Sequence, residues 1–165
     1  MPATYEPIAT TTLSSAAANI TFSSITSAYT DLRLVLTTTT SVSGQNIFMK
    51  FNSDSGTNYS YTDISGNGAT VYANYISNYT SMILVWNGTS ATNPTFYTQD
   101  ILSYSGSTFK PVLSTTSEDD NGSGATRSAV QLWRSTSAIN NIALTLGSGN
   151  FNTGTTATLY GILKA

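Results

Sequence analysis

Residues 129–146, AVQLWRSTSAINNIALTL, constrain the fold of this chain more than any other stretch. Apolar and polar side chains alternate on both sides of a polar segment at 135–140, which predicts strands at 129–134 and 141–146. A third strand is expected at 156–163, within about a dozen residues of the second. Because consecutive strands usually pair with each other, we expect these three strands to form an antiparallel meander.

Short segments with the same two-residue alternation occur along the rest of the chain. Leu32, Leu34 and Leu36 share one face of an expected strand at 31–37, and that face should lie in the core. Residues 81–86 are apolar on both faces, which is typical of a strand covered on both sides. Another subunit is one candidate for the structure that covers the second face of this strand.

A hairpin is expected from residues 94–104 and 109–117. Residues 52–79 contain turn signals such as Gly66-Asn-Gly, which favour a loop-rich region around one strand at 59–64. In total, about eight to ten strands at short spacings, without helical periodicity, predict an all-β fold. We expect an antiparallel β-sandwich of jelly-roll type.

The N-terminal residues differ from the rest of the chain in their pattern. Residues 1–15 contain Pro2 and Pro7 among small and hydroxyl side chains, which favours an extended N-terminal arm with a short strand near 8–13. Such an arm either crosses a neighbouring molecule or forms an ordinary first edge strand. Residues 16–165 are expected to form a single β-sandwich domain, since a chain of this size can bury one core.

Charge is scarce in this sequence. Only 8% of the residues are charged, and Ser and Thr make up about a third of the chain, so the surface should be neutral and rich in hydroxyl groups. Ten Tyr, six Phe and two Trp favour a packed core over disorder. The six basic residues are spread singly, which disfavours nucleic-acid binding. The apolar runs are too short to cross a membrane and no export signal is recognisable, so we expect a soluble protein.

The sequence contains no cysteine and no histidine. This absence excludes disulfides, thiolate nucleophiles, imidazole bases and nearly every zinc, copper or haem site. Asp31, Asp54, Asp63 and Asp100 each stand alone near a strand end or turn, so no catalytic carboxylate pair is apparent. We therefore expect no enzyme activity, no catalytic residues and no cofactor.

The one acidic cluster matches part of an EF-hand calcium loop through Asp119, Asn121 and Gly122. The match fails at both ends, because Ser117 stands in place of the first Asp and Ser128 in place of the bidentate Glu. A solvated turn is the expected structure, and no metal site is predicted.

Aromatic residues are the remaining candidates for binding. Trp86 and Trp133 could stack on sugars, but both lie within expected strands among apolar neighbours, which favours packing in the core or at a subunit interface. The loop-rich region carries the candidate residues of a loop that binds a ligand or partner: Tyr59, Tyr61, Tyr72, Tyr75 and Tyr79.

Three stretches carry a resemblance to known proteins: ATTTLSSAAANITFSSITSAYTDLRLVL at 9–36, LWRSTSAINNIALTL at 132–146 and GNFNTGTTATLYGILKA at 149–165. Together they cover about a third of the chain. They resemble small virion structural proteins encoded by tailed bacteriophages, particularly phages of aquatic and cyanobacterial hosts. Residues 52–121 have no counterpart in this resemblance. Proteins of this group are variously assigned to capsid decoration and to tail appendages.

The resemblance implies a jelly-roll-like sandwich that acts by binding, as a homotrimer. Its leading implication is a capsid decoration, or cement, protein on the outer capsid surface of the virion, which bridges major capsid proteins and stabilises the shell. Tyr5, Pro7 and Ile8 are the expected partner contacts. The alternative is a tail-fibre or receptor-binding module that recognises host surface glycans through its tyrosine-rich loops. Neither reading involves nucleic acid or a membrane.

Overall fold

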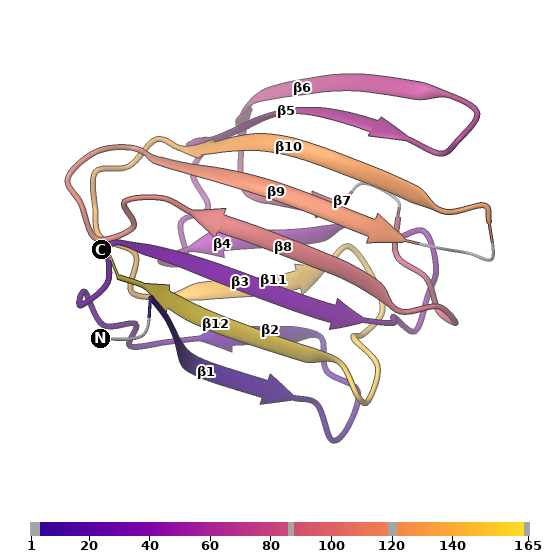
Figure 1. Ribbon diagram of the computed structural model, residues 1–165, viewed down its shortest axis with the longest axis horizontal. Coiled ribbons are helices and arrows are strands. Elements are labelled where there is room, and N and C mark those ends of the chain that lie inside the picture. The colour runs from indigo at the N-terminus through magenta and orange to yellow at the C-terminus, as the bar shows by residue number, and fades with distance from the viewer. Residues whose placement is uncertain (1–3, 86–87, 119–121, 164–165) are drawn as a thin grey trace.

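The computed structural model describes residues 4–85, 88–118 and 122–163. These residues form twelve β-strands and no helix, in two antiparallel sheets that pack face to face (Figure 1). The strands are β1 (Tyr5–Thr12), β2 (Asn19–Phe22), β3 (Asp31–Thr38), β4 (Ile47–Phe51), β5 (Tyr59–Gly66), β6 (Val71–Tyr79), β7 (Met82–Val85), β8 (Thr95–Ile101), β9 (Lys110–Glu118), β10 (Ala125–Trp133), β11 (Ile142–Leu146) and β12 (Thr156–Ile162). The predicted all-β antiparallel sandwich is confirmed, with more strands than expected, and its jelly-roll connectivity stays a prediction.

The two sheets differ in width. The large sheet has the order β1-β12-β3-β8-β9-β10-β5-β6, and the small sheet has the order β2-β11-β4-β7. β7, the last strand of the small sheet, contacts β9, β10 and β5 across the core. β5 and β6 form the uppermost hairpin in Figure 1, at the end of the large sheet. β5 still contacts β7 and its inward side chains Tyr59, Tyr61 and Asp63 are buried, so the large sheet is open at β6, whose side chains are nearly all exposed.

β3 shows the expected alternation in its clearest form. Leu32, Leu34 and Leu36 are fully buried, whereas Arg33 and Val35 on the opposite face are half-buried. Burial of one such leucine side chain contributes about 1.5–3 kcal/mol. The core between the sheets also contains large aromatic side chains: Phe22, Phe51, Tyr59, Tyr97, Tyr104, Trp133 and Phe151.

The predicted C-terminal meander is wrong, although its three strands exist as β10, β11 and β12. β10 pairs with β9 and β5 in the large sheet, whereas β11 pairs with β2 and β4 in the small one. The connection between them is anchored in the core by Ile139, which is buried and whose N–H donates to the Tyr104 carbonyl at 2.9 Å. Because each strand has one apolar face, opposite sheets let both faces be buried against each other.

The N-terminal segment is an edge strand of the sandwich itself. β1 pairs with β12 along its length, from Tyr5 opposite Ile162 to Thr12 opposite Thr156. A bulge between Pro7 and Ala9 lets the Ile8 side chain pack against the core. Of the two arrangements that the sequence left open, the structure has the edge strand, because pairing with β12 satisfies the backbone of residues that would otherwise extend into solvent.

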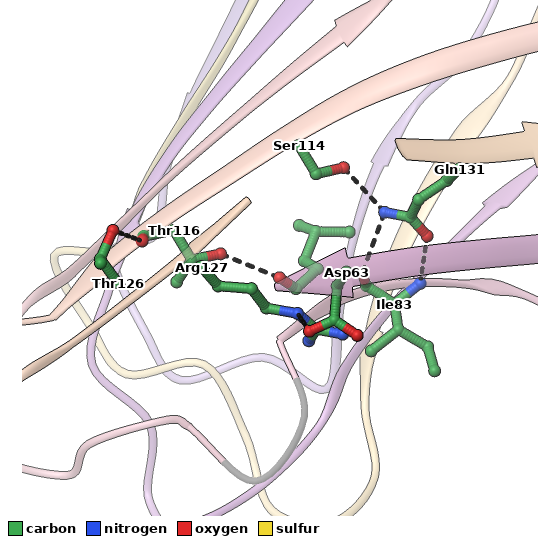
Figure 2. A network of polar contacts seen from close by, with 8 residues as sticks. Asp63, Ile83, Ser114, Thr116, Thr126, Arg127 and Gln131 are labelled. Carbon is green, nitrogen blue, oxygen red and sulfur yellow. Dashed lines mark hydrogen bonds and ion pairs between the residues drawn. The ribbon is translucent and has the colours of Figure 1, made fainter. Parts of the chain in front are cut away.

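β7 is covered by the chain's own sheets. Gln131 of β10 closes its free edge, because Oε1 accepts from the Ile83 N–H at 2.9 Å and Nε2 donates to the Ile83 carbonyl at 3.0 Å (Figure 2). Thr116 Oγ1 also donates to the Leu84 carbonyl at 2.9 Å. These bonds pair backbone groups that a buried strand edge would otherwise leave unsatisfied. Residues 81–85 are all buried within this single chain, without the second subunit that the sequence offered as one cover.

The expected loop-rich region at 52–79 is largely a hairpin. β5 and β6 pair from Tyr59 opposite Tyr79 to Gly66 opposite Val71. Asn67 forms the turn, since its Oδ1 accepts from the N–H groups of Ala69 at 3.1 Å and Thr70 at 2.8 Å. β6 escapes prediction because nearly all of its side chains are exposed, so it lacks a buried face that would produce alternation.

Gly161 of β12 provides a test of packing near the chain termini. A Cβ at this position would overlap the ring of Tyr29, whose hydroxyl donates to Glu6 Oε2 at 3.0 Å. We predict that Gly161→Ala lowers the free energy of unfolding by about 1–3 kcal/mol in urea titrations, because the ring must move. In a Tyr29→Ala background the same substitution should be neutral or stabilising, since strand propensity favours Ala over Gly. Equal loss in both backgrounds would contradict the steric explanation.

Candidate functional site

A cleft of about 730 Å³ lies on the inner face of the large sheet, where the β5–β6 hairpin extends past β7. A volume of this size is typical of small-molecule sites. Its walls combine aromatic, amide, hydroxyl and charged side chains from four neighbouring strands: Tyr61, Asp63, Tyr72, Asn74, Thr116 and Arg127.

Strand register places these side chains in rows across the sheet. Ser65 lies opposite both Arg127 and Tyr72, and Asp63 lies opposite Asn74 in the next row. Directly opposed residues of antiparallel strands project from the same face. The rows therefore bring Arg127, Asp63, Tyr72 and Asn74 together as the floor and one wall of the cleft, on rigid strands instead of loops.

A buried ion pair forms the centre of this floor. Arg127 Nε lies 2.8 Å from Asp63 Oδ2, and the two side chains are only 9% and 2% exposed. Figure 2 shows them side by side, next to the hydrogen bonds that fix β7. Asp63 Oδ1 and Arg127 Nη1 have no hydrogen-bond partner among the described residues. Each is thus a buried polar atom with unused bonding capacity, in a fold that otherwise pairs most such atoms.

Tyr61 lies beneath the guanidinium group. Its ring centroid is 5.3 Å from Arg127 Cζ, within the range of a cation–π contact. Burial raises the pKa of the Tyr61 hydroxyl, and the positive charge of Arg127 opposes that effect. The tyrosine therefore stays protonated at neutral pH and supports the arginine from below.

The opposite face of the same hairpin is apolar. Five exposed side chains of β5, β6, β9 and β10 form what we call the outer apolar strip: Ile64, Val71, Tyr75, Leu113 and Val130. Val130 lies opposite Leu113 on one side and Thr62 on the other, and Thr62 lies opposite Tyr75. This register places Leu113, Val130 and Tyr75 in one row across four strands, with Thr62 between Val130 and Tyr75. Clustered exposed apolar side chains of this kind mark interaction surfaces.

The five candidate tyrosines do not form one site, and they lie in strands instead of a loop. Tyr59 is fully buried in the core, and Tyr61 is on the cleft floor. Tyr72 is half-exposed on the cleft side, whereas Tyr75 projects from the outer face by strand alternation. Tyr79 is half-buried beside Phe48, with ring centroids 6.5 Å apart. Tyr72 and Tyr75 are the two that offer most of their ring to a partner.

The three N-terminal candidate residues also differ in how accessible they are. Tyr5 is partly exposed, and its ring lies 5.6 Å from Arg33 Cζ. Pro7 is exposed on the β1 edge, and Ile8 packs against the core. Tyr5 and Pro7 are thus accessible to a partner, whereas Ile8 acts mainly in holding β1 to the sandwich.

Trp133 is a core residue. It is 2% exposed, stacks on Tyr59 with ring centroids 6.3 Å apart, and donates from Nε1 to Asp54 Oδ2 at 2.7 Å. Trp86, Asp119, Asp120 and Asn121 lie outside the described residues. Within the described part of the chain, no group of three or more carboxylate side chains could hold a metal ion. Nor does that part contain a helix that is long and apolar enough to cross a membrane.

Comparisons of the chain with protein-family models, with curated proteins and with solved structures found no match. The geometry of the cleft and of the outer apolar strip is therefore the basis for assigning a function. Asp63 and Arg127 were not predicted as partners from the sequence. The available signal was their inward position in alternating strands, since Asp63 continues the buried series Tyr59 and Tyr61.

The buried ion pair should be far more important for stability than the exposed one. Asp63→Asn leaves Arg127 charged and buried without compensation, so we predict a loss of about 3–5 kcal/mol in the free energy of unfolding. The matched control is Asp100→Asn, which breaks the Arg33–Asp100 pair, whose side chains are 36% and 27% exposed. This control should lose about 0–1 kcal/mol in the same urea titration. Similar losses for both variants would show that Arg127 is effectively solvated.

Tyr59 should make the protein sensitive to alkali. Burial raises the pKa of its hydroxyl to about 12, so the folded state keeps the proton in a range where the unfolded state releases it. The contribution of the protonated Tyr59 hydroxyl to the free energy of unfolding is complete below about pH 10. It is lost as the pH rises towards 12, by about 1 kcal/mol per pH unit. Tyr59→Phe should therefore show a shallower fall in unfolding free energy between about pH 9 and pH 11. Parallel slopes for the two proteins would contradict this assignment.

Proposed function

We propose that this chain is a virion structural protein of a tailed bacteriophage, and specifically a decoration protein of the outer capsid surface. In this role it binds as a homotrimer across neighbouring major capsid proteins and stabilises the shell. The structural observation that carries the proposal is the outer apolar strip, a group of five exposed apolar side chains on one face of four adjacent strands. The resemblance of both ends of the chain to such proteins supports the same reading.

The outer apolar strip suits a lasting contact with another protein. Val71 and Tyr75 are 70% and 79% exposed, so each offers apolar area to a partner. At about 25 cal/mol per Å², burial of this area favours association, although part of the gain is offset by lost motional freedom. A decoration protein that binds the assembled shell but not the free capsid subunits stabilises the shell by mass action.

The edge of the large sheet offers a second means of attachment. β6 is the last strand of the sheet, and its outer backbone edge has no neighbouring strand in the described chain. Proteins often prevent a sheet edge from pairing with other chains by placing a lysine or an inward-pointing carboxylate on the edge strand. Residues 71–79 contain neither. An edge of this kind accepts an extended segment of another protein by β-augmentation.

A tail-fibre or receptor-binding module remains the second candidate, because the cleft lies beside the most exposed tyrosines. The two candidates differ in stoichiometry, since a shell carries many copies of a decoration protein and a tail carries few. Quantitative mass spectrometry of purified particles, with the major capsid protein as reference, separates them. We expect a ratio near one trimer per few capsid subunits. A handful of copies per particle would reject shell decoration, and absence from particles would reject both candidates.

Attachment should depend on the outer apolar strip. We predict that Val130→Asp lowers occupancy on particles stripped of this protein by about tenfold or more, because binding would bury an unpaired charge. Val130 is half-exposed, so the folded monomer should tolerate the change. Thr158→Asp, at the opposite end of the same sheet face, is the matched control and should retain full occupancy. Equal occupancy of both variants would exclude the strip as the contact.

A further inference from the structure

We propose that the cleft on the inner face binds a neutral sugar, as part of a carbohydrate. This inference concerns a different surface from the outer apolar strip and does not rest on attachment to a shell. It starts from two buried atoms of the ion pair that have neither a hydrogen-bond partner nor the ion-pair contact itself among the described residues, Asp63 Oδ1 and Arg127 Nη1. Both side chains line the cleft, and both residues are more than nine-tenths buried.

The two unpaired atoms define the hydrogen bonds that a ligand must supply. Asp63 Oδ1 is an acceptor, and Arg127 Nη1 is a donor. Neighbouring hydroxyl groups of a sugar can donate to the first and accept from the second at the same time. A ligand that meets both demands recovers bonding that the protein alone leaves unused, which makes hydroxyl pairs a better match than groups with only one bonding role.

The charge of the site favours a neutral ligand. Asp63 and Arg127 compensate each other within 2.8 Å, so the pair presents no net charge. An anionic ligand would meet the Asp63 carboxylate and, at the rim, Glu118, whereas a cation would meet Arg127. Removing a charged ligand from water without a dedicated counter-charge is costly. Neutral hydroxyl groups avoid this cost.

Aromatic and amide groups complete the match. Tyr72 is 51% exposed, on the same sheet face as the ion pair, so its ring can pack against the apolar C–H face of a sugar. Asn74, opposite Asp63, adds an amide that both donates and accepts. The cleft volume of about 730 Å³ lies within the range of ligand sites and admits a sugar of one to a few rings.

The site is also already built. Its side chains project from paired strands, and Arg127 is held from below by the Tyr61 ring. Sites on rigid elements bind with little reorganisation. Carbohydrate binding here therefore needs no lid closure or loop ordering.

The test uses the full-length protein on an array of immobilised oligosaccharides, with neutral glycans built from glucose, galactose, mannose and N-acetylglucosamine beside sialylated and sulfated glycans. Affinity for the best-retained neutral oligosaccharide is then measured by calorimetric titration. Tyr72→Ala and Asn74→Ala alter exposed side chains, so both should fold. Phe96→Ala, which removes a 44% exposed aromatic side chain of β8 that does not line the cleft, is the matched control.

We expect the wild-type protein to retain neutral glycans, and Tyr72→Ala to weaken binding roughly three- to tenfold, the usual cost of one aromatic contact. Phe96→Ala should bind as the wild type does. The proposal is overturned if the folded wild-type protein retains no neutral glycan, if it retains only acidic glycans, or if Tyr72→Ala and Phe96→Ala bind equally. Particle occupancy of Tyr72→Ala should remain complete, so failure of this inference and failure of shell attachment are separately visible.

Discussion

The hydrogen bonds of Gln131 determine how the two sheets of this sandwich meet. The Gln131 amide pairs with both backbone groups of Ile83, so β7 is fixed edge-on against the large sheet. The same Nε2 donates to Ser114 Oγ at 2.7 Å, and Ser114 in turn donates to Gln99 Oε1. This buried chain spans three strands of the large sheet and satisfies polar groups that would each cost about 1–3 kcal/mol if left alone. β7 is the last strand of the small sheet, so β6, the last strand of the large sheet, lies beyond it and forms one wall of the cleft.

Strand positions were largely predictable, because one buried face imposes alternation on residues such as Leu32, Leu34 and Leu36. The β8–β9 hairpin was also predictable, since its two segments are close in sequence and both alternate. Sheet membership was not, because alternation marks the buried face of β10 and β11 without saying which sheet each joins. β6 was missed for the opposite reason, since exposure on both faces leaves no pattern. The Asn67-Gly68 pair between two strand-like segments was the signal that could have revealed this hairpin.

The cleft was less predictable than the fold. Asp63 and Arg127 are far apart in the chain, and they meet only because β5 pairs with β10 in one particular register. A shift of one residue would direct both side chains to the opposite face. The tyrosine-rich segment is easily recognised in the sequence, but its side chains divide between core, cleft and outer face. That division follows strand alternation and needs the register to be known. Sequence alone therefore indicated the region and could not assemble the site.

The exposure of β6 on both faces also has a consequence for motion. Most of its side chains bury little area, so the strand is held chiefly by its backbone hydrogen bonds to β5. Segments with few buried contacts open at lower free energy than the core, in local fluctuations that leave the rest of the molecule intact. The amide protons of β6 should accordingly exchange with solvent well before those of β3 or β10. The β6 wall of the cleft is thus less protected than its charged floor, where the Asp63–Arg127 pair is buried on β5 and β10.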